Sequence, residues 1–269
     1  MLYQKIPPSE RLASFVKCYY QWEHDIAQGQ VLTVQSPPVG YEALVFNYGD
    51  PYKISTGNKE DVWVPTAFYS GQNTANYLLS LSNKVGMFGV VFQPAAFATL
   101  FRVSVKDTAD RRIALDDILG TEGKYLAQKI LETSTTAKRV QHIESFLLQK
   151  LWLSRLHITV ADEAARLIGN RNGIVSVQEI MNEIGSSRRP LERSFIEKVG
   201  VSPKFYARIR RFSYVSYHLM YQKDNWQELI YKGGYFDQSH FIKDFQFFNR
   251  QNPTDYLLQH KELIQYLER

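Results

Sequence analysis

A helical pattern occurs twice in the last third of the chain, with the two copies about fifty residues apart. The first copy, SVQEIMNEIGSSRRPLERSFIEKVGVSP, spans residues 176–203, and the second, NWQELIYKGGYFDQSHFIKDFQFFNRQNP, spans residues 225–253. Each copy has a short amphipathic segment, a turn containing glycine, and a second segment with apolar residues four apart. This order is typical of a helix-turn-helix, which presents its second helix to the DNA major groove. The duplication therefore predicts two such units.

The positive charge of the chain is concentrated on and beside the first copy. Residues 187–211 contain eight Lys or Arg and two acids, a balance of +6, whereas the whole chain has a net charge of +5. A local field of this kind favours phosphate binding. A run of arginines can also be an ordinary solvated helix face. Its position on a predicted recognition helix favours the DNA-binding interpretation.

The segment between the two copies predicts one long connecting helix. Ser202 is a suitable N-cap and Pro203 suits the first helical position. Apolar residues then recur at helical spacing, namely Phe205, Ile209, Phe212, Val215 and Leu219. A helix from residue 203 to about residue 222 would span roughly 30 Å. Because one turn of B-DNA is roughly 34 Å, this connector can hold two recognition helices in adjacent major grooves.

The elements SRRPLERSF…GVSP and GGYFDQSHFIKDF…NP, with the arginine-bearing connector, resemble the AraC/XylS-type DNA-binding domain over about residues 159–256. The resemblance implies seven helices, with two helix-turn-helix units joined by a long helix, and a transcription regulator that binds double-stranded DNA. It also implies which residues face DNA: Arg188, Arg189, Glu192 and Arg193 in the first unit, and Gln238, Ser239, His240 and Lys243 in the second. For His240 the alternative is packing against the turn aromatics Tyr235 and Phe236.

Four positions depart from the family pattern. Met181 and Ile230 stand where a small alanine is usual, and larger side chains there could splay or overpack the helices. Arg250 stands where a glycine usually ends the helix, and Pro190 is tolerable only in a first helical turn. The second recognition helix is also less basic than the first. Met181, Ile230, Arg250 and the less basic second helix motivate the alternative function, a ligand-binding or protein-interaction protein with a degenerate DNA-binding domain.

The first half of the chain predicts a β-rich domain. Short runs rich in Val, Phe, Tyr and Leu follow one another between residues 31 and 92, with turn signals between them, and helical patterns follow Pro94. Five stretches carry a second resemblance, namely PSERLASFVKCYYQWE, YEALVFNYGDPY, YSGQNT, VGMFGVVFQPAAFATLF and TADRR. They resemble the uncharacterised sensor-like domain that precedes AraC-type domains in many bacterial regulators, and related regulators often carry a cupin-like barrel there. The predicted fold is therefore a two-domain α+β protein. Residues 1–155 form a β-barrel or sandwich (cupin-like) with helices, and residues 156–269 form the all-α domain.

The N-terminal domain is expected to bind a small effector or to mediate self-association. Aromatic and polar side chains in the strand runs are candidates for a ligand pocket: Tyr41, Glu42, Phe46, Tyr69, Gln72 and Phe92. The alternative is that they fill the core. The apolar stripe of residues 138–152 predicts core packing, a homodimer contact or the contact between the two domains. RNA polymerase is a further expected partner.

Composition argues against catalysis and against a cofactor or metal. A metal-dependent cupin needs several histidines, but only His24 precedes residue 142. A single cysteine, Cys18, argues against an alkyl-transfer repair protein, which needs several. We therefore expect a protein that is not an enzyme. The sequence has no membrane-spanning run of roughly 18 apolar residues and no hydrophobic signal region, which predicts a cytoplasmic protein that does not bind membranes.

Overall fold

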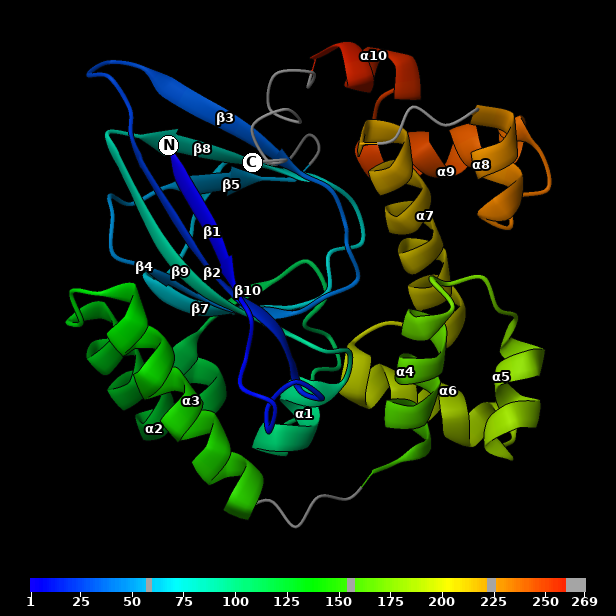
Figure 1. The fold of residues 1–269 in the computed structure, drawn as a ribbon, viewed down its shortest axis with the longest axis horizontal. Helices are drawn as coiled ribbons and strands as arrows, with labels where there is room; N and C mark the ends of the chain where they lie inside the picture. Colours follow the sequence, from blue (N-terminus) through cyan, green and yellow to red (C-terminus); the bar gives the residue numbers. More distant parts are fainter. Residues whose placement is uncertain (57–59, 154–157, 222–225, 260–269) are drawn as a thin grey trace.

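The computed structural model describes residues 1–269 except for 57–59, 154–157, 222–225 and 260–269. The predicted boundary between residues 155 and 156 lies outside the described residues. Strands dominate the first half and helices the second (Figure 1). The strands are β1 Leu2–Ile6, β2 Val16–Asp25, β3 Val31–Ser36, β4 Ala43–Asn47, β5 Lys53–Ser55, β6 Val62–Trp63, β7 Ala67–Ser70, β8 Tyr77–Ser82, β9 Lys84–Phe92 and β10 Arg112–Ala114. The helices are α1 Ala96–Phe101, α2 Leu115–Leu131, α3 Thr136–Leu153, α4 Val160–Asn170, α5 Val177–Ile184, α6 Arg188–Val199, α7 Pro203–Tyr221, α8 Trp226–Lys232, α9 Gln238–Asn249 and α10 Pro253–Gln259.

The strands form two antiparallel sheets. The larger has the order β1-β2-β9-β4-β7-β10 and the smaller has the order β3-β8-β5-β6. Both sheets are open at their edges rather than closed into a cylinder. Of the two predicted architectures, the sandwich is therefore the one that forms.

The six-stranded sheet is the middle layer of the N-terminal half. On one face Val45, Phe68 and Met87 pack against Leu79 and Leu81 of the smaller sheet. The other face packs against α1, α2 and α3, and its buried residues include Leu44, Phe46, Tyr69 and Phe88. Strand residues alternate between faces. Because both faces are covered, β4 has apolar residues at successive positions.

Helix α3 carries the stripe that was predicted as core or as a dimer contact. Ile143 and Leu147 have no exposed surface and pack into the helix-facing core. Val140, Phe146 and Leu151 pack partly buried around them. The stripe is therefore core, and the homodimer remains a prediction. No described helix is long and apolar enough to cross a membrane.

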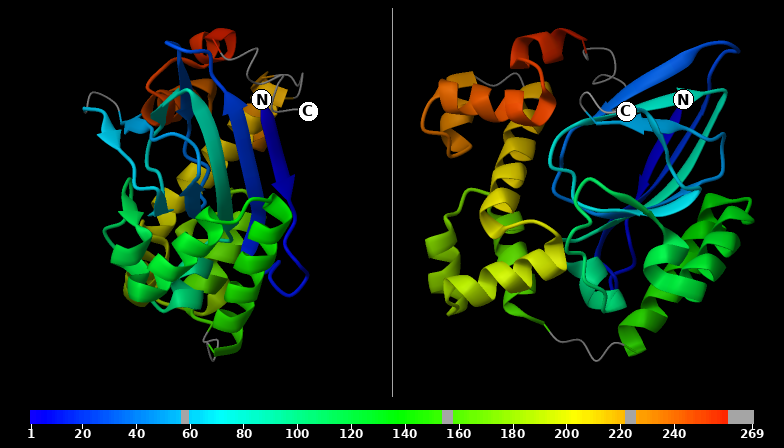
Figure 2. Two further views of the ribbon diagram at one scale, coloured as in Figure 1. Left: turned by 90° about the vertical axis from the view of Figure 1, so that its left-hand side faces the viewer. Right: turned by 180° about the vertical axis from the view of Figure 1, so that it is seen from behind.

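The C-terminal part is all-α, as predicted. The described residues after residue 157 form seven helices, α4 to α10. Helix α7 runs between two helical groups (Figures 1 and 2). Tyr206 near its start packs with α4, α5 and α6, whereas Ile209, Phe212 and Val215 pack with α8 and α9. The predicted N-cap is confirmed, because the Ser202 hydroxyl accepts a hydrogen bond from the Phe205 amide at 3.3 Å.

The unusual residues of the two units are accommodated by local packing. Met181 is partly buried against the first helical cluster, and Ile230 is buried in the second. Pro190 lies in the first turn of α6, where its missing N–H removes no intrahelical bond. Arg250 ends α9 in the left-handed conformation, with φ 60°, where Gly200 ends α6 with φ 80°. The second unit therefore ends its recognition helix with the same left-handed conformation as the first. The Cβ of Arg250 makes this conformation less favourable than it is for glycine.

Replacing Arg250 with glycine is expected to stabilise the protein. A left-handed residue with a Cβ is strained by roughly 1 kcal/mol, part of which glycine loses again in the unfolded chain. We expect Arg250→Gly to raise the free energy of unfolding by about 0.5 kcal/mol, as measured by urea denaturation. Arg171→Gly is the control, because Arg171 ends α4 with a negative φ of −94°. Equal or greater stabilisation by the control substitution would contradict this assignment of strain.

Candidate nucleic-acid interface and effector cavity

The first helix-turn-helix unit consists of α5 and α6. Ser176 caps α5 in a reciprocal capping box with Glu179, and Gly185 forms the left-handed turn between the helices with φ 64°. Leu191 and Phe195 hold one face of α6 in the core. The opposite face exposes Arg188, Arg189 and Arg193 to solvent. A carboxylate oxygen of Glu192 lies 2.9 Å from Nε of Arg188, so these two predicted contact residues form an ion pair on the surface.

Half of the cations in residues 187–211 have internal partners. Lys198 lies 2.6 Å from the Asp162 carboxylate and donates to the Thr99 hydroxyl at 2.8 Å. Arg208 pairs with buried Asp244 at 2.8 Å, and Arg211 lies 3.7 Å from the same carboxylate. Arg210 donates to the Val39 carbonyl at 2.9 Å. These four hold the fold together. The remaining four are Arg188, Arg189, Arg193 and Lys204.

The carboxylate of Asp162 is charged and bridges the two halves of the chain. Burial by itself raises the pKa of Asp162, but hydrogen bonds from Lys198, Thr159 and Thr99 outweigh it and lower the pKa below its usual value. Thr99 belongs to α1, whereas Asp162 and Lys198 belong to α4 and α6. This cluster therefore fixes the end of α6 against the N-terminal half.

The second unit consists of α8 and α9. Asp237 caps α9 by accepting a hydrogen bond from the His240 amide at 2.7 Å, and Gln238, Ser239 and Lys243 are exposed. The His240 ring packs edge-on against Tyr235, with centroids 5.0 Å apart. His240 thus packs against Tyr235, whereas Phe236 is exposed, and contact of His240 with DNA stays a prediction.

The two acids of the second recognition helix are structural. Asp237 is the N-cap of α9, and Asp244 is buried between Arg208 and Arg211. The two arginines neutralise the charge of Asp244, whereas Asp237 remains an exposed carboxylate at the start of the helix. The weak basicity of this helix, which motivates the degenerate alternative, therefore has a structural explanation only for Asp244.

Helix α7 places the two units at its opposite ends (Figure 1). It has 19 residues, which corresponds to about 28 Å. Helices α6 and α9 have the same length, 12 residues, and both have exposed side chains in their first turns. Since successive major-groove faces are roughly 34 Å apart, this spacing suits two recognition helices on one side of a duplex.

Both units are docked on the N-terminal half. The Tyr206 hydroxyl donates to the Gly40 carbonyl at 3.0 Å, close to the start of α7. At the end of α9, the Asn76 side chain and amide donate to the carbonyls of Asn249 and Phe248 at 2.9 and 2.7 Å. The loop after α1 is bound as well, because the Val105 amide donates to the Glu197 carbonyl at 2.9 Å. The N-terminal domain thus contacts both helix-turn-helix units.

An inter-sheet cavity of about 400 Å³ lies between the two sheets. Of the predicted ligand residues, Tyr41 and Glu42 line it. Phe46, Tyr69 and Phe92 belong instead to the core on the helix-facing side of the larger sheet. Gln72 is buried, and neither of its amide atoms has a hydrogen-bond partner among the described residues. The structure therefore does not bring the six candidates together.

Glu42 is a buried carboxyl group beside the domain contact. Only 1% of the residue is exposed, and neither of its oxygens has a well-formed hydrogen bond within the described part of the chain. Burial raises the pKa of Glu42 to about 8, and the neighbouring Tyr69 hydroxyl only partly opposes this shift. Glu42 is therefore mostly neutral at pH 7.

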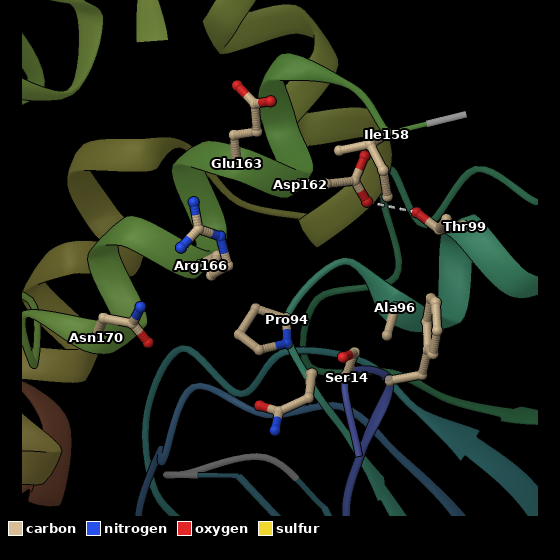
Figure 3. Close-up of a pocket in the computed structure, with 11 residues that line it drawn as sticks. Ser14, Pro94, Ala96, Thr99, Ile158, Asp162, Glu163, Arg166 and Asn170 are labelled. Carbon is tan, nitrogen blue, oxygen red and sulfur yellow. Dashed lines mark hydrogen bonds between the residues drawn. The ribbon is translucent and has the colours of Figure 1, made fainter. Parts of the chain in front are cut away.

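A second cavity, of about 490 Å³, lies between the N-terminal half and α4. Pro94, Ala96 and Thr99 line one side, and Asp162 and Arg166 line the other (Figure 3). The Thr99 hydroxyl donates to Asp162 at 2.6 Å across this boundary. The second cavity thus marks the contact between the two halves. The described residues contain no group of three His, Cys, Asp or Glu side chains placed to hold a metal ion.

Sequence reasoning missed several residues that the structure makes functional candidates. Arg112 and Asn73 line the inter-sheet cavity, and Gly40 and Asn76 hold the DNA-binding half. Gly40 and Asn76 lie in or beside turns and have no motif around them, whereas Asn73 and Arg112 lie in the stretches YSGQNT and TADRR. The importance of all four comes from partners or cavity neighbours that are distant in sequence, which no local signal reveals.

Residues 4–114 match the model of a domain of unknown function, DUF6597, and residues 180–259 match the model of a helix-turn-helix domain. No curated protein gives a significant match. The chain is similar to the solved structure of ToxT from Vibrio cholerae, with 13% identity, 89% of this chain and 98% of that chain covered, and a TM-score of 0.49. Unsaturated fatty acid-bound ToxT from strain SCE256 of that organism is 14% identical, with 89% and 95% covered and a TM-score of 0.45. The AraC-like transcriptional activator CuxR is 14% identical, with 78% and 85% covered and a TM-score of 0.27. The chain thus joins a domain of unknown function to a C-terminal helix-turn-helix domain of the AraC type.

Proposed function

We propose that this chain is a sequence-specific DNA-binding transcription regulator whose N-terminal domain controls the DNA-binding domain docked on it. The observation that carries this proposal is the pair of matched helix-turn-helix units at the two ends of α7, each with an exposed first turn on its second helix. We place the division between the domains at residues 155 and 156.

The two units would contribute unequally to binding. Arg188, Arg189 and Arg193 give the first recognition helix three exposed cations, whereas Lys243 is the exposed cation of the second. Phosphate contacts supply most of the electrostatic affinity, and base contacts supply specificity. The first unit would therefore dominate the salt dependence, and Gln238 would add base contacts, for example to adenine.

Footprinting on a site selected from genomic fragments tests this function. We expect protection of two major-groove segments about one helical turn apart on one face of the duplex. Protection of a single segment would mean that the second unit is only structural. Gel shifts at several salt concentrations that detect no preferred fragment would instead favour the ligand-binding or protein-interaction alternative.

Replacing Lys243 with alanine is expected to reduce the salt dependence of DNA binding. Loss of one phosphate contact lowers the slope of log K against log salt by about one unit. Fluorescence anisotropy with a labelled duplex at several salt concentrations measures this slope. Lys84→Ala removes another exposed cation, at the start of β9, and should leave the slope unchanged. Equal slopes for Lys243→Ala and the unmodified chain would remove Lys243 from the interface.

A further inference from the structure

We propose that the inter-sheet cavity binds a small organic acid with a flat, apolar body, and that the Arg112 guanidinium binds its carboxylate. The cavity has a volume of about 400 Å³, within the range of small-molecule sites. Aromatic side chains form much of its lining, namely Tyr3, Tyr20, Trp22, Tyr52 and Tyr77. Aromatic faces stack well on planar ligands. The shape and lining therefore favour a flat molecule.

Arg112 supplies the charge that selects an acid. It lies on edge strand β10, with its Cζ 4.0 Å from the centroid of the Tyr77 ring. Both of its terminal nitrogens are buried, and neither has a hydrogen-bond partner among the residues that the structure describes. The guanidinium group keeps its positive charge in proteins, and burying a charge without a hydrogen-bond partner lowers the stability of the fold. A carboxylate can accept one N–H from each of the two terminal nitrogens at once, which gives both of these nitrogens a charge-assisted hydrogen bond.

Asn73 adds a second polar contact in the same cavity. Its Oδ1 is buried and has no hydrogen-bond partner within the described ranges. A donor on the ligand, such as an indole N–H, would satisfy it. The unsatisfied groups of Arg112 and Asn73 thus describe a ligand with one anionic end and one donor.

The cavity shares its walls with the segments that hold the DNA-binding domain. Val39 and Tyr41 line the cavity, and Arg210 of α7 donates to the Val39 carbonyl and lies 4.5 Å from the centroid of the Tyr41 ring. On the other side Gln35 lines the cavity and donates to the Asn249 carbonyl at the end of α9, at 3.4 Å. A ligand in the cavity would therefore contact the residues of the N-terminal domain that hold both helix-turn-helix units. This regulatory part rests on the proposed function, whereas ligand binding does not.

Titration calorimetry with the full chain tests the site, using indole-3-acetate, its neutral analogue indole-3-acetamide, and the aliphatic acid hexanoate as probes. We expect indole-3-acetate to bind at least tenfold more tightly than either of the others. Arg112→Met should weaken binding of indole-3-acetate at least tenfold. The affinity of Arg112→Lys should lie between those of Arg112→Met and the unmodified chain, because lysine keeps the charge but lacks the planar guanidinium. Arg111→Met, which changes an exposed neighbour, should bind like the unmodified chain.

Three outcomes would overturn the proposal. Equal affinity for the acid and its amide, or unchanged binding by Arg112→Met, would remove Arg112 as the carboxylate partner. Equal affinity for hexanoate would remove the flat body from the ligand class. Thermal melting checks that Arg112→Met is folded, and the acid-against-amide comparison needs no variant at all. Calorimetry uses no DNA, so its result is separate from that of footprinting, and a later gel shift with and without indole-3-acetate measures the regulatory part.

Discussion

Replacing Glu42 with glutamine is expected to raise the free energy of unfolding by about 3 kcal/mol more at pH 7 than at pH 4. The pKa of Glu42 is about 8 in the folded chain, against an ordinary value of 4.5. Below pH 4.5 the group is protonated in both states and carries no penalty. As the pH rises from 4.5 to 8, the unfolded chain loses the proton first, so folding becomes less favourable. Glutamine keeps a similar shape and has no proton to lose, which removes this loss.

Denaturant unfolding at pH 4, 7 and 8.5 measures the effect. The stability of the unmodified chain should fall relative to that of Glu42→Gln between pH 4 and 8.5, and most steeply between 4.5 and 8. Glu10→Gln replaces an exposed carboxylate in the same domain and is the control. If the curves of Glu42→Gln and the unmodified chain run parallel across this range, the carboxyl is solvated or paired in solution and the buried geometry is incorrect.

The helical half could be predicted in detail because its signals are local. Gly185 and Gly200 mark helix ends, Ser202 and Pro203 mark a helix start, and apolar residues recur every three to four positions. Each of these signals involves residues within one turn of each other. The end of α9 was less clear, because Arg250 adopts a conformation that glycine normally marks.

The sheets could be predicted only as β-rich runs. Strand β4 is buried on both faces, so ALVFN shows no alternation of polar and apolar residues. Nothing in it reveals which residues face the smaller sheet and which face the helices. The pairing of β2 with β9 joins residues about seventy positions apart, and no turn signal specifies it. Strand β1, LYQKI, is an edge strand of mixed composition and gave no signal at all.

In the candidate site too, features with local sequence signals could be predicted, and features that depend on distant partners could not. Exposure of Arg189 and Arg193 follows from their helical offset from Leu191 and Phe195, which can be read from the sequence. The internal role of Lys198 cannot, because its partner Asp162 lies 36 residues earlier. In the sheets, the register of each strand decides whether a side chain reaches the cavity or the helices, and the register comes from the pairing.

Removing both Arg189 and Arg193 is expected to weaken binding to the specific DNA site by about 2–6 kcal/mol, since a good bidentate contact to guanine is worth roughly 1–3 kcal/mol. The two residues lie four apart, on the exposed face of α6. They have no structural task comparable to that of Lys198, so Arg189→Ala with Arg193→Ala should leave the thermal melting temperature nearly unchanged.

The comparison of specific with non-specific DNA decides what these arginines do. Lys106→Ala with Arg111→Ala removes the same charge from exposed positions of the N-terminal domain and should change neither affinity. If Arg189 and Arg193 read bases, binding to the selected site should fall far more than binding to random DNA, because phosphate contacts are shared by all sequences and base contacts are not. Equal loss on both duplexes would make the pair phosphate contacts. Sequence recognition would then depend on the first turn of α9, where Gln238 and Ser239 are exposed.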